Sequence, residues 1–257
     1  MYFSAEHLAL ANQALRETFQ QCSIVWQSIP HWDTHDPGQI SVESGILNSP
    51  GFLPLLPQQA SFQLTVAEAL APTPDALVTG VMAATETLAK TVDGDVLPKC
   101  FAGAANTITI PTNTPQDVQN SLISARVFVE NAGYRAPSCL VTNTVGLQSL
   151  NQLANGYYNI LQQTLAAANI NSLYRSEPLD TTNQSKARMV FIGRRRRIAQ
   201  GAAPEASAGE EPVDIAVSLP PSLEVDGETS TGTIQLTARI RYATRITDAT
   251  GLVAIKQ

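Results

Sequence analysis

Residues 30–57 read PHWDTHDPGQISVESGILNSPGFLPLLP, with five prolines and three glycines among them. Proline fixes φ and lacks a backbone donor, so an α-helix cannot continue through this stretch. Short β-like pieces such as Gln39–Glu43 lie between the prolines. A helix-free connection over 23–57 is unusual inside a compact domain, and a lone two-stranded hairpin is barely stable in water. We therefore predict an extended arm that gains its stability by lying on another subunit.

Amphipathic helices are expected on both sides of this arm. Apolar residues recur at helical spacing over 4–22, where Ser4 is placed to cap the helix. A long helix over 74–92 has Thr73 as its expected cap and carries one apolar stripe, formed by Leu77, Val81, Ala84, Leu88 and Val92. A third helix is expected from Pro115 to Gly133, because proline suits the first turn and glycine the end. These helices are expected to pack on a sheet.

The remaining chain alternates short strands and helices before it becomes strand-rich. Helices are expected at 145–154 and 157–168, and strands at 61–66, 138–142, 188–192, 213–219, 233–246 and 252–255. Residues 200–212 have the composition of a flexible loop, and Pro220–Pro221 predicts a break after the strand before it. Apolar and polar residues alternate over 233–246, which predicts a strand with one buried face. The fold class is therefore α+β.

Composition narrows the class of protein. The chain has 257 residues, of which 44% are hydrophobic and 15% charged, with a net charge of −6. The low charge leaves neutral surface that favours assembly with a partner, and the acidic balance argues against a dedicated nucleic-acid reader. No apolar run approaches the roughly 20 residues of a membrane span, so no membrane partner is expected. The first residues lack the pattern of a secretory signal, and three scattered cysteines fit a reducing compartment.

Few residues are candidates for catalysis. His31 and His35, with the nearby Asp33 and Asp36, have the residue types of a metal site, but the flanking prolines favour a polar turn. No nucleophile elbow and no phosphate-binding glycine motif occurs. Cys22 ends an apolar helix and is expected in the core. We predict no enzyme activity, no catalytic residue, no metal and no cofactor, and keep a metal-dependent enzyme as a third alternative.

Two groups of arginines stand out in this acidic chain. Arg194–Arg197 form one run, and Arg239, Arg241 and Arg245 form a second row on one strand face. The run could contact phosphates, pair with acids of a neighbouring subunit or line a pore. It could equally be a solvated strand end balanced by Glu205, Glu210 and Glu211. The net negative charge favours pairing between subunits over a nucleic-acid track.

The order of elements, together with several short stretches, resembles the Hong Kong 97-type capsid fold of tailed-phage major capsid proteins and encapsulin shell proteins. The stretches that carry the resemblance are LPLLPQQASFQL at 53–64, the helix at 74–92 followed by Phe101–Gly103, APSCLVTN at 136–143, DIAV at 214–217 and the strand at 235–246. The resemblance implies an N-terminal helix at 1–22 and an extended loop at 23–60. It also implies a peripheral domain with a long spine helix at 61–135, an axial domain at 136–212, and return strands of the peripheral domain at 213–257.

The resemblance also implies a function. The chain is expected to form pentamers and hexamers of an icosahedral shell, as the major capsid protein of a tailed phage or prophage that encloses double-stranded DNA in a virion assembled in the bacterial cytoplasm. The alternative is an encapsulin, a cytoplasmic nanocompartment that encloses a cargo enzyme. The run at Arg194–Arg197 favours the virus, and the compact length and helical start favour the encapsulin.

The residues expected at contacts between subunits come from the arm and from the arginines. They are Trp32, Asp33, Ile40, Val42, Phe52, Leu53, Arg194, Arg195, Arg196, Arg197, Arg239, Arg241 and Arg245. Some relatives join their subunits covalently through a lysine of the extended loop. The first lysine of this chain is Lys90, so a non-covalent shell is predicted.

Overall fold

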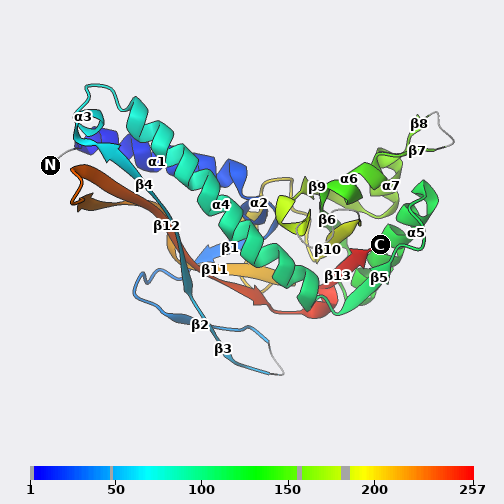
Figure 1. The fold of residues 1–257 in the computed structure, drawn as a ribbon. Coiled ribbons are helices and arrows are strands. Elements are labelled where there is room, and N and C mark those ends of the chain that lie inside the picture. The colour runs from blue at the N-terminus through cyan, green and yellow to red at the C-terminus, as the bar shows by residue number, and fades with distance from the viewer. Residues whose placement is uncertain (1–2, 47–48, 155–157, 181–185) are drawn as a thin grey trace.

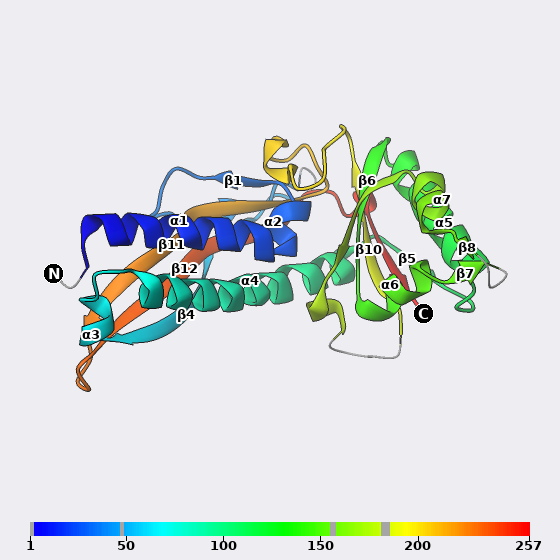
Figure 2. The same ribbon diagram turned by 90° about the horizontal axis from the view of Figure 1, so that it is seen from above.

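A long helix, α4 (Asp75–Gly103), runs along one β-sheet and ends against a second one (Figures 1 and 2). The structure is a computed structural model that describes residues 3–46, 49–154, 158–180 and 186–257. The expected apolar stripe is buried throughout, and the buried residues Val96, Leu97 and Cys100 extend it beyond the predicted end at 92. Pro98 lies inside the helix without ending it. The helix is longer than predicted because its last turns pack on the second sheet.

The start of α4 differs from the expected cap. Pro74 occupies the cap position and no side chain caps the helix, whereas the Thr73 hydroxyl donates to the Asp75 carboxylate at 2.9 Å. Asp75 in the first turn still complements the positive end of the helix dipole. A short helix, α3 (Val66–Ala69), precedes this corner and is closed by a capping box between Thr65 and Glu68.

The first sheet has four strands in the order β1–β11–β12–β4. Its strands are β1 (His31–Asp33), β11 (Val213–Glu228), β12 (Thr233–Ile246) and β4 (Leu56–Thr65). All neighbours are antiparallel except β1, which pairs in parallel with β11. The alternation predicted for 233–246 is confirmed, because its apolar residues Ile234, Leu236, Ala238, Ile240 and Tyr242 are all buried.

The predicted break at Pro220–Pro221 is wrong. Strand β11 continues through both prolines, and its register against β12 shifts between Val217 and Leu219 and again between Leu219 and Ser222. Proline cannot donate a ladder hydrogen bond, and a bulge is a place where a strand tolerates that loss. The prolines therefore distort the strand without ending it.

The N-terminal helix α1 (Ala5–Cys22) runs beside α4 and packs against both α4 and β11 (Figure 2). Ser4 caps it as predicted, accepting from the amide of His7 at 3.1 Å. Leu15 and Phe19 are fully buried in the core that α1 shares with α4 and the first sheet. Cys22 is exposed, so its predicted burial is wrong.

A second short helix, α2 (Ile24–Ser28), corrects the expectation that 23–57 lacks a helix. Its start is held by Asp93 of α4, whose carboxylate accepts from the Ser23 hydroxyl at 2.7 Å and from the amides of Ile24 and Val25 at 2.9 and 3.0 Å. Burial raises the pKa of Asp93 to about 6, while these three hydrogen bonds act to lower it. An acid on α4 therefore adds to the local signal for this helix, which is the Ser23 hydroxyl that accepts from the amide of Trp26 at 3.2 Å.

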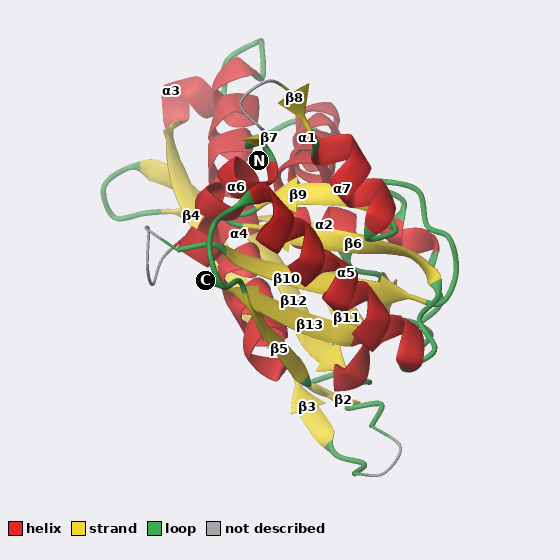
Figure 3. Ribbon diagram, turned by 90° about the vertical axis from the view of Figure 1, so that its right-hand side faces the viewer, coloured by secondary structure: helices red, strands yellow, loops and turns green. Residues whose placement is uncertain are grey.

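The second sheet has five strands in the order β5–β13–β10–β6–β9. They are β5 (Asn106–Thr109), β13 (Leu252–Lys256), β10 (Arg188–Arg194), β6 (Ala136–Thr142) and β9 (Ile170–Arg175). Helices lie against one face of this sheet (Figure 3). They are α5 (Pro115–Asn131), capped by Thr114, and the shorter α6 (Thr144–Leu150) and α7 (Leu161–Ala167). The other face meets the core around α4.

The pairing of β5 and β13 bears on the predicted domains. Strand β13 pairs in parallel with β5, so 106–109 and 252–256 join the sheet that contains 136–142. The division into 61–135, 136–212 and 213–257 stays a prediction, and the sheet pairing favours placing β5, α5 and β13 with the axial part.

Smaller elements complete the chain. They are β2 (Ser41–Glu43), β3 (Phe52–Pro54), β7 (Leu153–Ala154), β8 (Tyr158–Asn159) and the 3₁₀ turns η1 (Glu177–Asp180), η2 (Ala203–Glu205) and η3 (Ala249–Gly251). The loop predicted at 200–212 contains η2, and its residues Ala203 and Glu211 are buried. Within the described ranges, none of the helices combines the length and apolarity that a bilayer crossing requires.

Candidate assembly surface around the projecting hairpin

Strands β2 and β3 pair antiparallel as a hairpin that projects from the body of the subunit (Figures 1 and 3). Its base is fixed to the first sheet, because Val42 and Leu55 are 3% and 5% exposed and pack with Ala216 and Ala243. Val42 was expected to contact another subunit. That contact stays a prediction, and within the subunit the buried Val42 side chain holds the hairpin to the sheet.

The rest of the hairpin has little cover within its own subunit. Ile40 and Phe52 are each 75% exposed, and Leu53 is only partly buried against the base. Large apolar side chains this exposed on a narrow ribbon favour contact with another molecule. Asp33 is exposed at the end of β1, where its carboxylate accepts from the amide of His35 at 2.7 Å.

A buried ion pair connects the hairpin base to the sheet. Arg245 on β12 donates from Nε and Nη2 to both carboxylate oxygens of Asp214 on β11, at 2.7 and 2.8 Å. Its Nη1 donates to the carbonyl of Glu43 in the hairpin at 3.2 Å, and its guanidinium lies 5.0 Å from the ring centre of Trp32. The Trp32 indole also donates to Asp214 at 3.0 Å. Arg245 and Trp32 were expected between subunits, and the structure gives both of them partners within one.

The arginine run divides into inner and outer members. Arg194 is 1% exposed and donates to the carbonyls of Ser28 and Ile198 at 3.0 and 3.4 Å, so it also serves the subunit interior. Arg196 pairs with Glu210 at 3.3 Å. Arg197 is exposed, and no ion pair to it occurs within the described residues. The expected contact between subunits stays a prediction for Arg195, Arg196 and Arg197.

The row on β12 also has partners within the subunit. Arg239 forms an ion pair with Glu224 on β11, and Arg241 donates to the carbonyl of Pro37 at 3.1 Å. Both side chains are partly exposed, so a further contact with a neighbour stays a prediction for them.

The two histidines of the candidate metal site lie in different surroundings. His31 stacks on Trp26 with ring centres 3.5 Å apart, whereas His35 is exposed in a turn at φ 60°. Within the described part of the chain, no three His, Cys, Asp or Glu residues are placed to hold a metal ion. Burial lowers the pKa of His31 to about 4, so the ring is neutral near pH 7.

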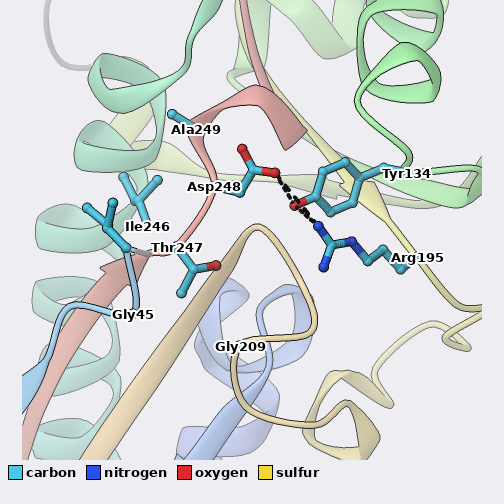
Figure 4. Close-up of a pocket in the computed structure, with 9 residues that line it drawn as sticks. Gly45, Tyr134, Arg195, Gly209, Ile246, Thr247, Asp248 and Ala249 are labelled. Atoms are coloured by element: carbon cyan, nitrogen blue, oxygen red, sulfur yellow. Dashed lines mark hydrogen bonds and ion pairs between the residues drawn. The ribbon is translucent and has the colours of Figure 1, made fainter. Parts of the chain in front are cut away.

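A pocket of about 550 Å³ lies between the hairpin residues that follow β2, Gly45 and Ile46, and the segment that joins β12 to β13 (Figure 4). On one side the Tyr134 hydroxyl donates to the Asp248 carboxylate at 2.8 Å and accepts from Arg195 Nη2 at 3.2 Å. Burial, followed by the nearby Asp248, raises the pKa of Tyr134 well above its usual value, so the phenol stays protonated. Sequence reasoning missed this cluster, because its members are far apart in the chain and match no motif.

Comparison with known proteins gives a fold but no close relative. No protein-family model and no curated protein matches the sequence. A virus-like particle from Pyrococcus furiosus is similar over 98% of both chains, with 14% identity and a TM-score of 0.68. A phage-related protein from Bordetella bronchiseptica RB50 is similar over 96% of both, with 9% identity and a TM-score of 0.69. The SrpI encapsulin of Synechococcus elongatus PCC 7942 is similar over 92% of this chain and 88% of its own, with 10% identity and a TM-score of 0.57.

The chain has the Hong Kong 97-type capsid fold. This confirms the predicted fold class, and identities this low show the fold alone. That α4 is the spine helix and the hairpin the extended loop of this fold stays a prediction.

We expect the Asp214–Arg245 pair to be essential for subunit stability. Arg245→Met should cost about 3–5 kcal/mol in the free energy of unfolding, because it leaves Asp214 as an uncompensated buried charge. Arg239→Met is the matched control: it removes an exposed pair between the same two strands and should cost about 1 kcal/mol or less. Urea unfolding followed by circular dichroism measures both. Equal losses would contradict the role given to Arg245.

His31 predicts acid sensitivity. Its pKa in the folded chain lies below the value of 6.5 for the free group, so its contribution to stability is complete above pH 6.5 and is lost as pH falls towards 4. His31→Phe keeps a ring against Trp26 and cannot charge. The variant should therefore lose less stability than the wild type between pH 7 and 4.5, as read from urea midpoints. Asp93 titrates in both chains, so its effect cancels in the difference, and identical losses would refute the prediction.

Proposed function

We propose that this chain is the subunit of a closed icosahedral shell, built from pentamers and hexamers of the chain itself. The projecting hairpin carries the proposal, because its Ile40 and Phe52 are largely uncovered in the lone subunit. Contacts between unlike surfaces, repeated around rotation axes, close into rings and containers. A virus-like particle, a mature phage capsid and an encapsulin among the similar structures support this use of the fold.

The contacts of the proposed shell are non-covalent. The hairpin and the residues around it, 23–60, contain no lysine that could form an amide bond to a neighbour. Association then depends on apolar burial and on pairs of charges, both of which respond to salt and denaturant.

The first candidate for the content is double-stranded DNA. The chain would then be the major capsid protein of a tailed phage or prophage, assembled in the bacterial cytoplasm and carried in the virion. Similarity to capsids such as that of cyanophage P-SCSP1u supports this candidate.

The second candidate is an encapsulin with a cargo protein, and the structure weakens the support that the arginine run gives to the virus. Arg194 is buried and Arg196 is paired with Glu210, so the run presents less positive charge to a polyanion than its sequence suggests. Particles purified from the native host separate the candidates: nuclease-protected DNA supports the capsid, and a stoichiometric second protein supports the encapsulin.

Assembly should depend on the hairpin while folding should not. The carbonyl of Ile40 accepts from the amide of Leu55 at 2.8 Å, so a short Gly-Ser-Gly link can replace 41–54 without opening the sheet. We expect a soluble, cooperatively folding subunit that forms no closed particles in negative-stain microscopy, under conditions where the wild type forms them. Normal particles from this variant would contradict the proposal.

Point variants test the same contact with less change to the chain. Ile40→Glu combined with Phe52→Glu should lower particle yield by at least about tenfold, because each charge would have to enter an apolar interface. Leu70→Glu, at a residue 61% exposed beyond α3, is the matched control and should assemble like the wild type. Light scattering measures yield, and equal yields from all three chains would count against the hairpin contact.

A further inference from the structure

The pocket beside Gly45 and Ile46 is divided into an apolar side and a charged side. Ile46, Ile246 and Ala249 form its apolar lining, and Tyr134, Arg195 and Asp248 form its polar end (Figure 4). A hollow with apolar walls and a few convergent polar groups is the usual form of a binding site. The side chains described above line this pocket without filling it.

At the polar end of the pocket, the guanidinium of Arg195 has N–H donors that the described residues leave unused. Its Nη2 donates to Tyr134, and its distance to the Asp248 carboxylate is a long 3.8 Å. That carboxylate already accepts from the Tyr134 hydroxyl and from the amide and hydroxyl of Thr250. Within the described residues, Nε and Nη1 of Arg195 have no acceptor, and its side chain is 46% exposed. A second carboxylate fits this unsatisfied guanidinium.

The hairpin carries a matching pair of side chains. Glu43 on β2 lies directly opposite Phe52 on β3, so the two project from the same face. Both are exposed, and the Glu43 carboxylate forms no ion pair in the part of the chain that the structure describes. The hairpin thus presents one aromatic ring beside one acid, and the pocket offers apolar walls beside one incompletely paired arginine.

The subunit's own hairpin does not make this contact. Gly45 and Ile46 of that hairpin already form one wall of the pocket, while its Phe52 stays 75% exposed. The same two groups are complementary in charge and apolarity when they come from different copies.

We propose that the pocket receives Glu43 and Phe52 from the hairpin of a second copy of this chain, with the ring against Ile46 and Ile246 and the carboxylate on Arg195. This proposal rests on the shell function and names the surface on which the hairpin is received. An aromatic anchor in a pocket, next to a desolvated charge pair, has the composition of an interface hot spot.

A charge swap tests the pairing. Glu43→Arg and Arg195→Glu should each lower particle yield about tenfold or more, because each places like charges in contact, and the double variant should recover to within about twofold of the wild type. Arg16→Glu, at an exposed arginine of α1 that is not among the predicted contacts between subunits, is the control and should assemble normally. Phe52→Ala should lower yield without changing the melting temperature of the dissociated subunit.

The measurements separate folding, assembly and the specific contact. Arg195→Glu also loses its bond to Tyr134, but a fold damaged in this way would not be rescued by Glu43→Arg. Wild-type particles together with normal yields from both single variants would assign the pocket to another occupant and overturn the proposal, while the shell function would stand. A double variant no better than the worse single variant would also overturn it. A wild-type chain that stays monomeric would refute both.

Discussion

The buried pair of Asp214 and Arg245 is the interaction on which the arrangement around the hairpin depends. Adjacent strands β11 and β12 provide the two charges, and both carboxylate oxygens are used. The Asp214 carboxylate also accepts from the Trp32 indole and from the Gly209 amide, and Arg245 donates to the hairpin carbonyl of Glu43. Because a buried charge without a partner is costly, these segments can meet in few other ways. The pair therefore fixes where the hairpin leaves the body.

The fold buries the apolar side chains of the body but leaves those of the hairpin largely exposed. Helices α1 and α4 cover one face of the first sheet, and α4 continues to the second sheet, so one core runs through most of the subunit. A two-stranded hairpin has two faces and cannot bury both of them by itself. Val42 and Leu55 bury one side at the base, and Ile40 and Phe52 stay uncovered. In the proposed shell, association with another copy would cover these side chains.

The arginines of this protein mainly form contacts within their own subunit. Most of the arginines that stood out in the sequence have acids or carbonyls of their own chain as partners, and Arg194 and Arg245 are buried. The outer members, Arg195 above all, keep donors available for another molecule. A protein with 15% charged residues and a net charge of −6 can therefore associate through apolar contacts with a few specific ion pairs.

Local periodicity determined much of the fold: the buried stripe of α4, the buried face of β12, and the arm that prolines keep from becoming helical. These features depend on neighbouring residues in the chain, so the sequence alone contains them. Tertiary structure decided the rest. Helix α2 is held in part by the Asp93 carboxylate, 70 residues away from Ser23, and the extra turns of α4 pack on the second sheet. The pocket of Tyr134, Arg195 and Asp248 exists only once the hairpin loop at Gly45 and Ile46 meets the segment between β12 and β13, because no local pattern links residues so far apart.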